Sequence, residues 1–132
     1  MLSYKHSGNG APDLIVLESH QKLGAAIELM QRYGISQLPV VRSAPADSLA
    51  DVIGSLNERV LLDRIFRDPD ALGEDVAAAM QPPLGAVEMS DTVDQVFADL
   101  RDQRQAVVVV RNGKPEAVLT RSDLLEYLAH RR

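Results

Sequence analysis

The stretch LGAAIELM at residues 23–30 has a counterpart with the same apolar spacing 70 residues later, VDQVFADL at residues 93–100. In both stretches apolar residues stand at positions i, i+3, i+4 and i+7, which is the spacing of an amphipathic helix. Each predicted helix lies between short apolar runs that are typical of buried strands. The chain therefore contains the same structural unit twice, and this duplication decides the fold.

The repeated unit is predicted to be β-α-β-β-α. Strands are expected at 14–17, 37–41 and 51–55 in the first copy, and at 84–88, 105–110 and 115–119 in the second. Helices are expected at 21–33, 57–67, 91–103 and 121–130, with a further short helix at 73–80. These elements predict an α/β (α+β) fold of two halves with pseudo-twofold symmetry, facing each other across equivalent clefts.

Glycine, asparagine and proline mark the ends and bends of these elements. Gly34 is placed to end the first long helix in the left-handed conformation. Asn112-Gly113 predicts a two-residue hairpin, because both positions tolerate positive φ. Pro39 has no N–H to give to a strand ladder, so it indicates an edge position or a bulge within strand 37–41.

The duplication also divides the chain into predicted segments. Residues 1–12 contain Ser7-Gly8-Asn9-Gly10 and are expected to form a flexible tail or an interdomain linker. The first repeat is expected over 13–67 and the second over 68–132.

Composition excludes several classes of protein. The chain has 132 residues, of which 45% are apolar, and it has no cysteine. Disulfides and thiolate metal sites are therefore excluded, and a reducing, cytoplasmic location is expected. No apolar stretch approaches the ~18 residues that cross a membrane, so no membrane partner is expected. Fourteen basic against nineteen acidic residues, without a basic stripe, argue against a nucleic-acid partner.

The sequence contains no recognisable catalytic motif. It lacks the phosphate-binding loop, the dinucleotide-binding glycine pattern and the nucleophile elbow. Its three histidines, His6, His20 and His130, have no metal-ligand partner at i+4, so no metal site is expected. No catalytic residue is therefore assigned, and an enzymatic role of this chain is not expected.

A hydroxyl residue followed three positions later by an acid occurs in both copies. The pairs are Thr120 and Asp123 in the second copy and Ser55 and Glu58 in the first, an offset of 65. Such a pair can be a capping box, in which each side chain bonds the other residue's backbone N–H. It can also bind a vicinal diol such as a ribose, because a carboxylate accepts two hydrogen bonds. Both interpretations stay open at this point.

Two stretches carry a family resemblance. Residues 33–41 (YGISQLPVV) and 117–125 (AVLTRSDLL) resemble the signatures of the cystathionine β-synthase (CBS) domain, of which a tandem pair forms a Bateman module. The resemblance covers about residues 14–130. Residues 54–62 (GSLNERVLL), followed by 80–84 (MQPPL), look most like the C-terminal regulatory region of bacterial cystathionine β-synthases, in particular those of actinobacteria.

The resemblance implies an adenosine-containing ligand held between the repeats. Likeness to cystathionine β-synthases suggests S-adenosylmethionine, and likeness to the wider family suggests AMP or ATP. Asp123 would bind the ribose hydroxyls and Thr120 would support the ribose. The other implied ligand-binding residues are Gln105, Ala106 and Val107, whose backbone would read the adenine, Val118, Gly85 and Ala86 as apolar walls, and Arg121, which would face an anion or solvent.

A second, weaker site is expected in the first copy, at Ser55, Glu58, Gln37, Leu38 and Pro39. The longer Glu58 would crowd a ribose, and Arg59 falls where the second copy has Leu124. By resemblance the module would pair into a homodimer through helices 21–33 and 91–103 or their neighbours. It would also regulate an attached pyridoxal-phosphate-dependent catalytic domain. The alternatives are an AMP- or ATP-sensing module and a ligand-free oligomerisation domain.

Overall fold

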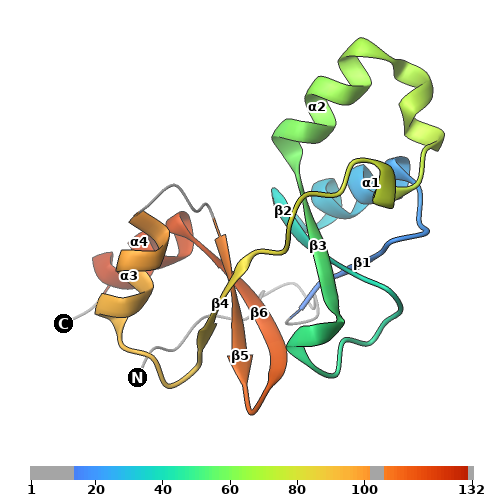
Figure 1. Ribbon diagram of the computed structural model, residues 1–132. Helices are drawn as coiled ribbons and strands as arrows, with labels where there is room; N and C mark the ends of the chain where they lie inside the picture. Colours follow the sequence, from blue (N-terminus) through green and yellow to red (C-terminus); the bar gives the residue numbers. More distant parts are fainter. Residues whose placement is uncertain (1–13, 102–105, 131–132) are drawn as a thin grey trace. The chain divides into compact units, whose positions relative to one another are not determined.

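The computed structural model of the protein describes residues 14–101 and 106–130 (Figure 1). The chain divides into two compact units, with the division between Pro83 and Leu84. The predicted tail at 1–12, the helix end at 102–103 and Gln105 lie outside the described residues.

The unit over residues 15–83 contains the first copy of the repeat. Its elements are β1 (Leu17–Glu18), α1 (Leu23–Tyr33), β2 (Gln37–Val41), β3 (Val52–Asn57) and α2 (Glu58–Arg67), with short 3₁₀ turns η1 (Leu49–Asp51), η2 (Pro69–Gly73) and η3 (Val76–Ala78). The sheet order is β1-β2-β3, where β1 and β2 are parallel and β2 and β3 antiparallel. The first strand is shorter than the predicted 14–17 and begins three residues later.

The unit that begins at Leu84 repeats this topology. Its elements are β4 (Gly85–Glu88), α3 (Val93–Arg101), β5 (Ala106–Arg111), β6 (Lys114–Thr120) and α4 (Arg121–Ala129). The sheet order is β4-β5-β6, again with one parallel and one antiparallel pair. Figure 1 shows α3 and α4 side by side on one side of this sheet. Within residues 14–101 and 106–130, two three-stranded sheets and four α-helices confirm the predicted α+β fold of two β-α-β-β-α repeats.

The turn predictions agree with the backbone. Gly34 has φ 63° and ends α1, and its N–H bonds the carbonyl of Met30. Asn112 and Gly113, with φ 54° and 80°, connect β5 to β6. Both turns depend on local conformation alone, which is why they could be predicted from neighbouring residues.

The predicted helix at 73–80 is wrong. Glu74 and Asp75 are extended and separate η2 from η3. This segment forms hydrogen bonds with the residues around the start of α1 instead. The N–H of Leu23 donates to the Glu74 carbonyl at 2.9 Å, and the N–H of Val76 donates to the Gln21 carbonyl at 2.7 Å. Tertiary hydrogen bonds therefore replace the helical ones that the local pattern indicated.

Pro39 does not lie on an edge strand, because β2 is the central strand of its sheet. The alternative prediction was a bulge, and the β2–β3 register does shift close to Pro39, between Val40 and Val41. Pro39 is opposite Ser55, and both backbone groups of Ser55 bond Gln81 rather than β2, at 2.9 and 2.8 Å. The missing N–H of Pro39 therefore removes no hydrogen bond from the β2–β3 ladder.

Each unit has its own aliphatic core. Leu17, Leu23, Leu38 and Leu56 are fully buried in the first, together with Val76 from the segment after α2. The core of the second consists mainly of side chains from β4, β5, β6 and the helices α3 and α4. These cores hold the strand ends and helix starts in place, where the candidate site residues lie.

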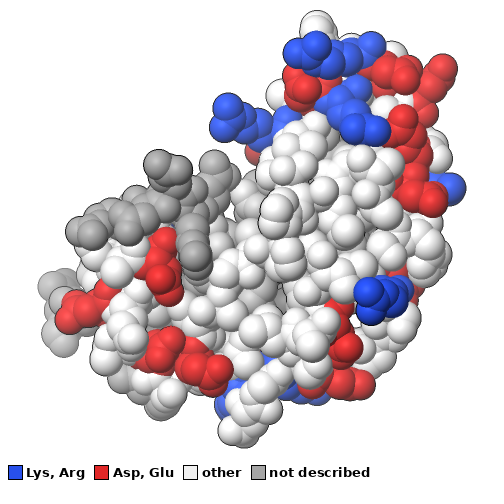
Figure 2. Space-filling model, viewed as in Figure 1, with Lys and Arg blue, Asp and Glu red and all other residues white. Residues whose placement is uncertain are grey.

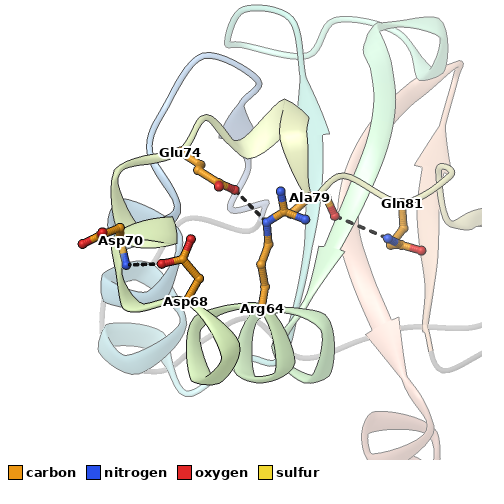
Figure 3. A network of polar contacts seen from close by, with 6 residues as sticks. All are labelled: Arg64, Asp68, Asp70, Glu74, Ala79 and Gln81. Atoms are coloured by element: carbon orange, nitrogen blue, oxygen red, sulfur yellow. Dashed lines mark hydrogen bonds and ion pairs between the residues drawn. The ribbon is translucent and has the colours of Figure 1, made fainter.

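The segment after α2 is fixed to that helix by polar contacts (Figure 3). Arg64 reaches across from α2, and its Nε donates to Glu74 Oε1 at 2.7 Å. Asp68 Oδ1 accepts from the N–H of Asp70 at 3.1 Å and starts η2. The Gln81 amide donates to the Ala79 carbonyl at 3.4 Å. Residues 68–83 thus pack with the first unit, and the predicted repeat boundary after residue 67 stays a prediction.

The surface over α2 carries both signs of charge. Figure 2 shows Lys and Arg beside Asp and Glu in the region where Figure 1 draws α2. One ion pair there joins Arg67 Nε to Asp63 Oδ1 at 3.0 Å. In the part of the chain that the structure describes, no helix combines the length and apolar character needed to cross a membrane.

Candidate functional site

The second copy places Thr120 and Asp123 at the junction of β6 and α4. Thr120 is the N-cap of α4, and its Oγ1 accepts from the N–H of Asp123 at 3.1 Å. In return Asp123 Oδ2 accepts from the Thr120 N–H at 2.9 Å and from the Thr120 hydroxyl at 3.0 Å. The predicted capping box is confirmed, and it holds an exposed carboxylate in a fixed position at the helix start.

The sheet register brings other predicted residues to the same end. Ala106 is opposite Thr120 across β5 and β6, and Val107 is opposite both Leu119 and Gly85. Val118 and Ala86 both flank Val108, one step further along the sheet. Because side chains alternate along a strand, Ala86, Ala106 and Val118 share the face of Thr120. Gly85 and Val107 face the opposite way, and Val107 is part of the core of this unit.

The first copy is capped differently from the prediction. The N-cap of α2 is Asn57, whose side-chain oxygen accepts from the N–H of Val60 at 2.9 Å. Ser55 lies two residues earlier inside β3, and Glu58 is already the first residue of the helix. The capping-box interpretation of Ser55 and Glu58 is therefore wrong.

The two copies align at an offset of 63, not 65, around their last helices. Asn57 pairs with Gln37 where Thr120 pairs with Ala106, at the start of the central strand of each sheet. Leu61 is the buried residue of α2 as Leu124 is of α4, 3% and 5% exposed. Val60 is thus the counterpart of Asp123, and Arg59 that of Ser122. Sequence contained this signal, since LNERVLL at 56–62 aligns without a gap on LTRSDLL at 119–125.

The family model described as the CBS domain matches this chain twice, at residues 11–67 and 74–130. The chain belongs to the CBS-domain family. The two matches account for both copies of the repeat, and CBS-domain modules are typically regulatory rather than catalytic. The tandem arrangement predicted from sequence is confirmed.

Solved structures of CBS-domain proteins share this fold. A CBS-domain protein from Burkholderia ambifaria MC40-6 is 22% identical with a TM-score of 0.76, over 93% of this chain and 91% of that one. CBSX2, solved with AMP, is 22% identical with a TM-score of 0.70, over 89% and 88%. The CBS domain of a bacterial CNNM/CorC family Mg²⁺ transporter, solved with ATP, is 22% identical with a TM-score of 0.73, over 92% and 84%.

Arg121 has a structural partner in the second CBS repeat. Its Nε donates to the Leu100 carbonyl at 2.7 Å, which joins the first turn of α4 to the last turn of α3. The sequence predicted that Arg121 would face solvent or an anion. Its main contact is instead the Leu100 carbonyl, which could be found only from the tertiary structure.

Replacing Arg121 by alanine is expected to lower the free energy of unfolding by about 1 kcal/mol, because a charge-assisted hydrogen bond between two helices is lost. Urea unfolding measures this loss, and Arg121→Lys, which can still donate to the carbonyl, is the matched control. Because the side chain is committed to the Leu100 carbonyl, the affinity for an adenosine ligand, if one binds this repeat, should change less than ~3-fold, or under about 0.7 kcal/mol. A large loss of ATP affinity with unchanged stability would instead make Arg121 a phosphate ligand.

Ser55 is also structural in the first CBS repeat. It is 4% exposed, and its hydroxyl donates to the Pro82 carbonyl at 2.7 Å. Gln37 and Pro39 lie beside it at the start of β2, and Leu38 is fully buried. Within the described residues no group of three or more acidic or histidine side chains lies close enough to hold a metal ion.

Proposed function

We propose that the second CBS repeat binds an adenosine-containing metabolite at Thr120 and Asp123, and that ligand binding gives this regulatory module its signal. The observation that carries the proposal is the fixed carboxylate at the start of α4. Asp123 Oδ2 is held by Thr120, while Asp123 Oδ1 has no hydrogen-bond partner among the described residues. A ribose diol offers two donors to such a group.

The surroundings of Asp123 suit the rest of an adenosine. Ala86 and Val118 offer apolar side chains on the same face of the sheet, and neither is fully buried. Ala106, opposite Thr120, and Val107 beside it are proposed to present backbone groups to the adenine, with Gln105 adjoining them. The AMP and ATP found with two proteins of the same fold support an adenosine ligand.

The finer identity of the ligand is our inference. We place S-adenosylmethionine first, on the sequence resemblance to cystathionine β-synthases, and AMP or ATP second. A triphosphate needs several cations, yet Lys114 begins β6 at the opposite end from Thr120, six residues or ~20 Å away. Arg121 already uses its Nε on Leu100. S-adenosylmethionine, a sulfonium compound without phosphates, needs no such group of cations.

The wider setting of the module is also inferred from the resemblance. We propose that it regulates a pyridoxal-phosphate-dependent catalytic domain, that it acts in the cytoplasm, and that it forms a homodimer. For the dimer, large exposed apolar side chains occur on α2, α3 and α4, namely Leu62, Phe66, Phe97 and Leu125. The helix 21–33 proposed for the interface, now α1, contributes none of these, so the neighbouring helices are the better candidates.

A thermal-shift titration with S-adenosylmethionine, AMP and ATP tests the ligand. At ~100 times its dissociation constant a ligand adds ~2.7 kcal/mol of stability, which raises the Tm by several degrees in a chain of this size. We expect the largest shift with S-adenosylmethionine. A shift with AMP or ATP alone would make the module an energy sensor. No shift with any of them would leave Thr120 and Asp123 as a helix cap and the chain as an oligomerisation domain.

A further inference from the structure

We propose that each chain holds one ribose site, in the second CBS repeat, and that the first repeat has no counterpart because Val60 stands where the second has Asp123. The inference rests on the proposed function and adds its stoichiometry: one adenosine ligand for two repeats. It also assigns the first repeat a structural role.

The start of α2 shows what replaces the carboxylate. The Asn57 amide oxygen takes the N–H of Val60, and the Ser36 carbonyl takes the N–H of Glu58 at 3.0 Å. Val60 itself is an apolar residue that packs against the first core, which includes Leu38 and Leu61. This cap forms without an acid at Val60, so the counterpart position of Asp123 offers no carboxylate oxygen to a ribose diol.

Neither acid of α2 takes over the position of Asp123. Glu58 precedes Val60 by two residues, which turns its side chain by ~200° about the helix axis. Asp63 is one turn further along α2 and accepts from Arg67 Nε. The longer side chain of Glu58 is therefore not what prevents binding; its direction is wrong, and the site lacks its acceptor.

The strand that leads into α2 is also committed to a structural contact. Ser55, the counterpart of Val118, bonds Gln81 through both backbone groups and Pro82 through its hydroxyl. Met80 covers Gly54 on the same strand. In the second repeat the equivalent strand, β6, supplies the proposed wall residue Val118. In the first repeat β3 packs against the segment 79–82 instead.

Calorimetric titration of the full chain with S-adenosylmethionine, AMP and ATP in turn tests the stoichiometry. We expect ~1 ligand per chain for whichever probe binds, and binding at least ~100-fold weaker in Asp123→Ala. A stoichiometry near 2 that falls to 1 in Asp123→Ala would overturn the inference while the proposed function stood. Absence of binding by every probe would overturn the proposed function itself, so the two failures are distinguishable.

A gain of binding provides the second test. In the Asp123→Ala background, Asn57→Thr with Val60→Asp rebuilds the capping box of the second repeat in the first. We expect one site to return with an affinity more than ~10-fold below the original, a loss above about 1.4 kcal/mol, because β3 still packs against the segment 79–82. Asn57→Thr with Val60→Asn is the matched control without the charge and should not bind. If the variant with Val60→Asp folds but does not bind, the missing carboxylate is not what keeps the first repeat empty.

Discussion

Replacing Asp123 by alanine is expected to weaken adenosine-ligand binding at least ~100-fold. The carboxylate is proposed to accept both ribose hydroxyls, and a hydrogen bond to a charged group contributes about 1.5–3 kcal/mol. Losing two such bonds removes at least ~3 kcal/mol, which is a factor of ~100 in the dissociation constant. Calorimetric titration with S-adenosylmethionine and with AMP measures the change.

The same substitution also removes part of the α4 cap, so stability has to be separated from binding. Loss of the cap contribution is expected to cost ~0.5–2 kcal/mol, which leaves the protein folded. Asp91→Ala is a matched control, because Asp91 Oδ2 accepts from the Glu88 N–H at 2.8 Å, a similar local bond at the other end of the same sheet. Unchanged ligand affinity in Asp123→Ala would refute the site assignment.

Replacing Gly54 by valine is expected to lower the free energy of unfolding by ~1–3 kcal/mol, because it overpacks the contact between β3 and the segment 79–82. A Cβ at Gly54 would overlap the Met80 side chain and lie 2.9 Å from the Gln81 carbonyl oxygen. For a chain of this size the Tm should fall by roughly 3–15 °C. Thermal unfolding followed by circular dichroism measures the loss.

Two further variants identify the cause. Gly73→Ala is the control, since nothing lies within 4 Å of a Cβ added there, and its Tm should stay within about 2 °C of the original. Adding Met80→Ala to Gly54→Val removes the overlapping side chain and should recover part of the stability, although the contact with the Gln81 carbonyl remains. If Gly54→Val is as stable as the original protein, the segment 79–82 does not pack on β3 as described.

Several features of the fold and site were predictable because they depend on residues close in sequence. The apolar spacing of α1 and α3, the end of α1 at Gly34 and the turn at Asn112-Gly113 are each determined within a few residues. The Thr120–Asp123 capping box spans only three positions and was found in the same way. Duplication strengthened the helix predictions, since an apolar spacing seen twice is less often accidental.

The first-copy site was mispredicted for a reason that can be traced. Both interpretations, Ser55 with Glu58 and Asn57 with Val60, fit the local sequence, because Ser and Asn are equally good caps. The choice depends on where β3 ends, and that strand extends to Asn57 because it pairs with Gln37. A hydroxyl-to-acid pattern alone could not reveal that pairing.

Sequence by itself determined the tandem CBS repeats, the order of their elements and the carboxylate at the start of α4, because periodicity, caps and tight turns are short-range. Only the tertiary structure decided the path of residues 69–82, the structural use of Ser55 and the bond from Arg121 to Leu100. Those contacts join residues that are 27 and 21 positions apart, in Ser55–Pro82 and Arg121–Leu100. They form because buried polar groups need partners, and which partner is near depends on the packing of the whole unit.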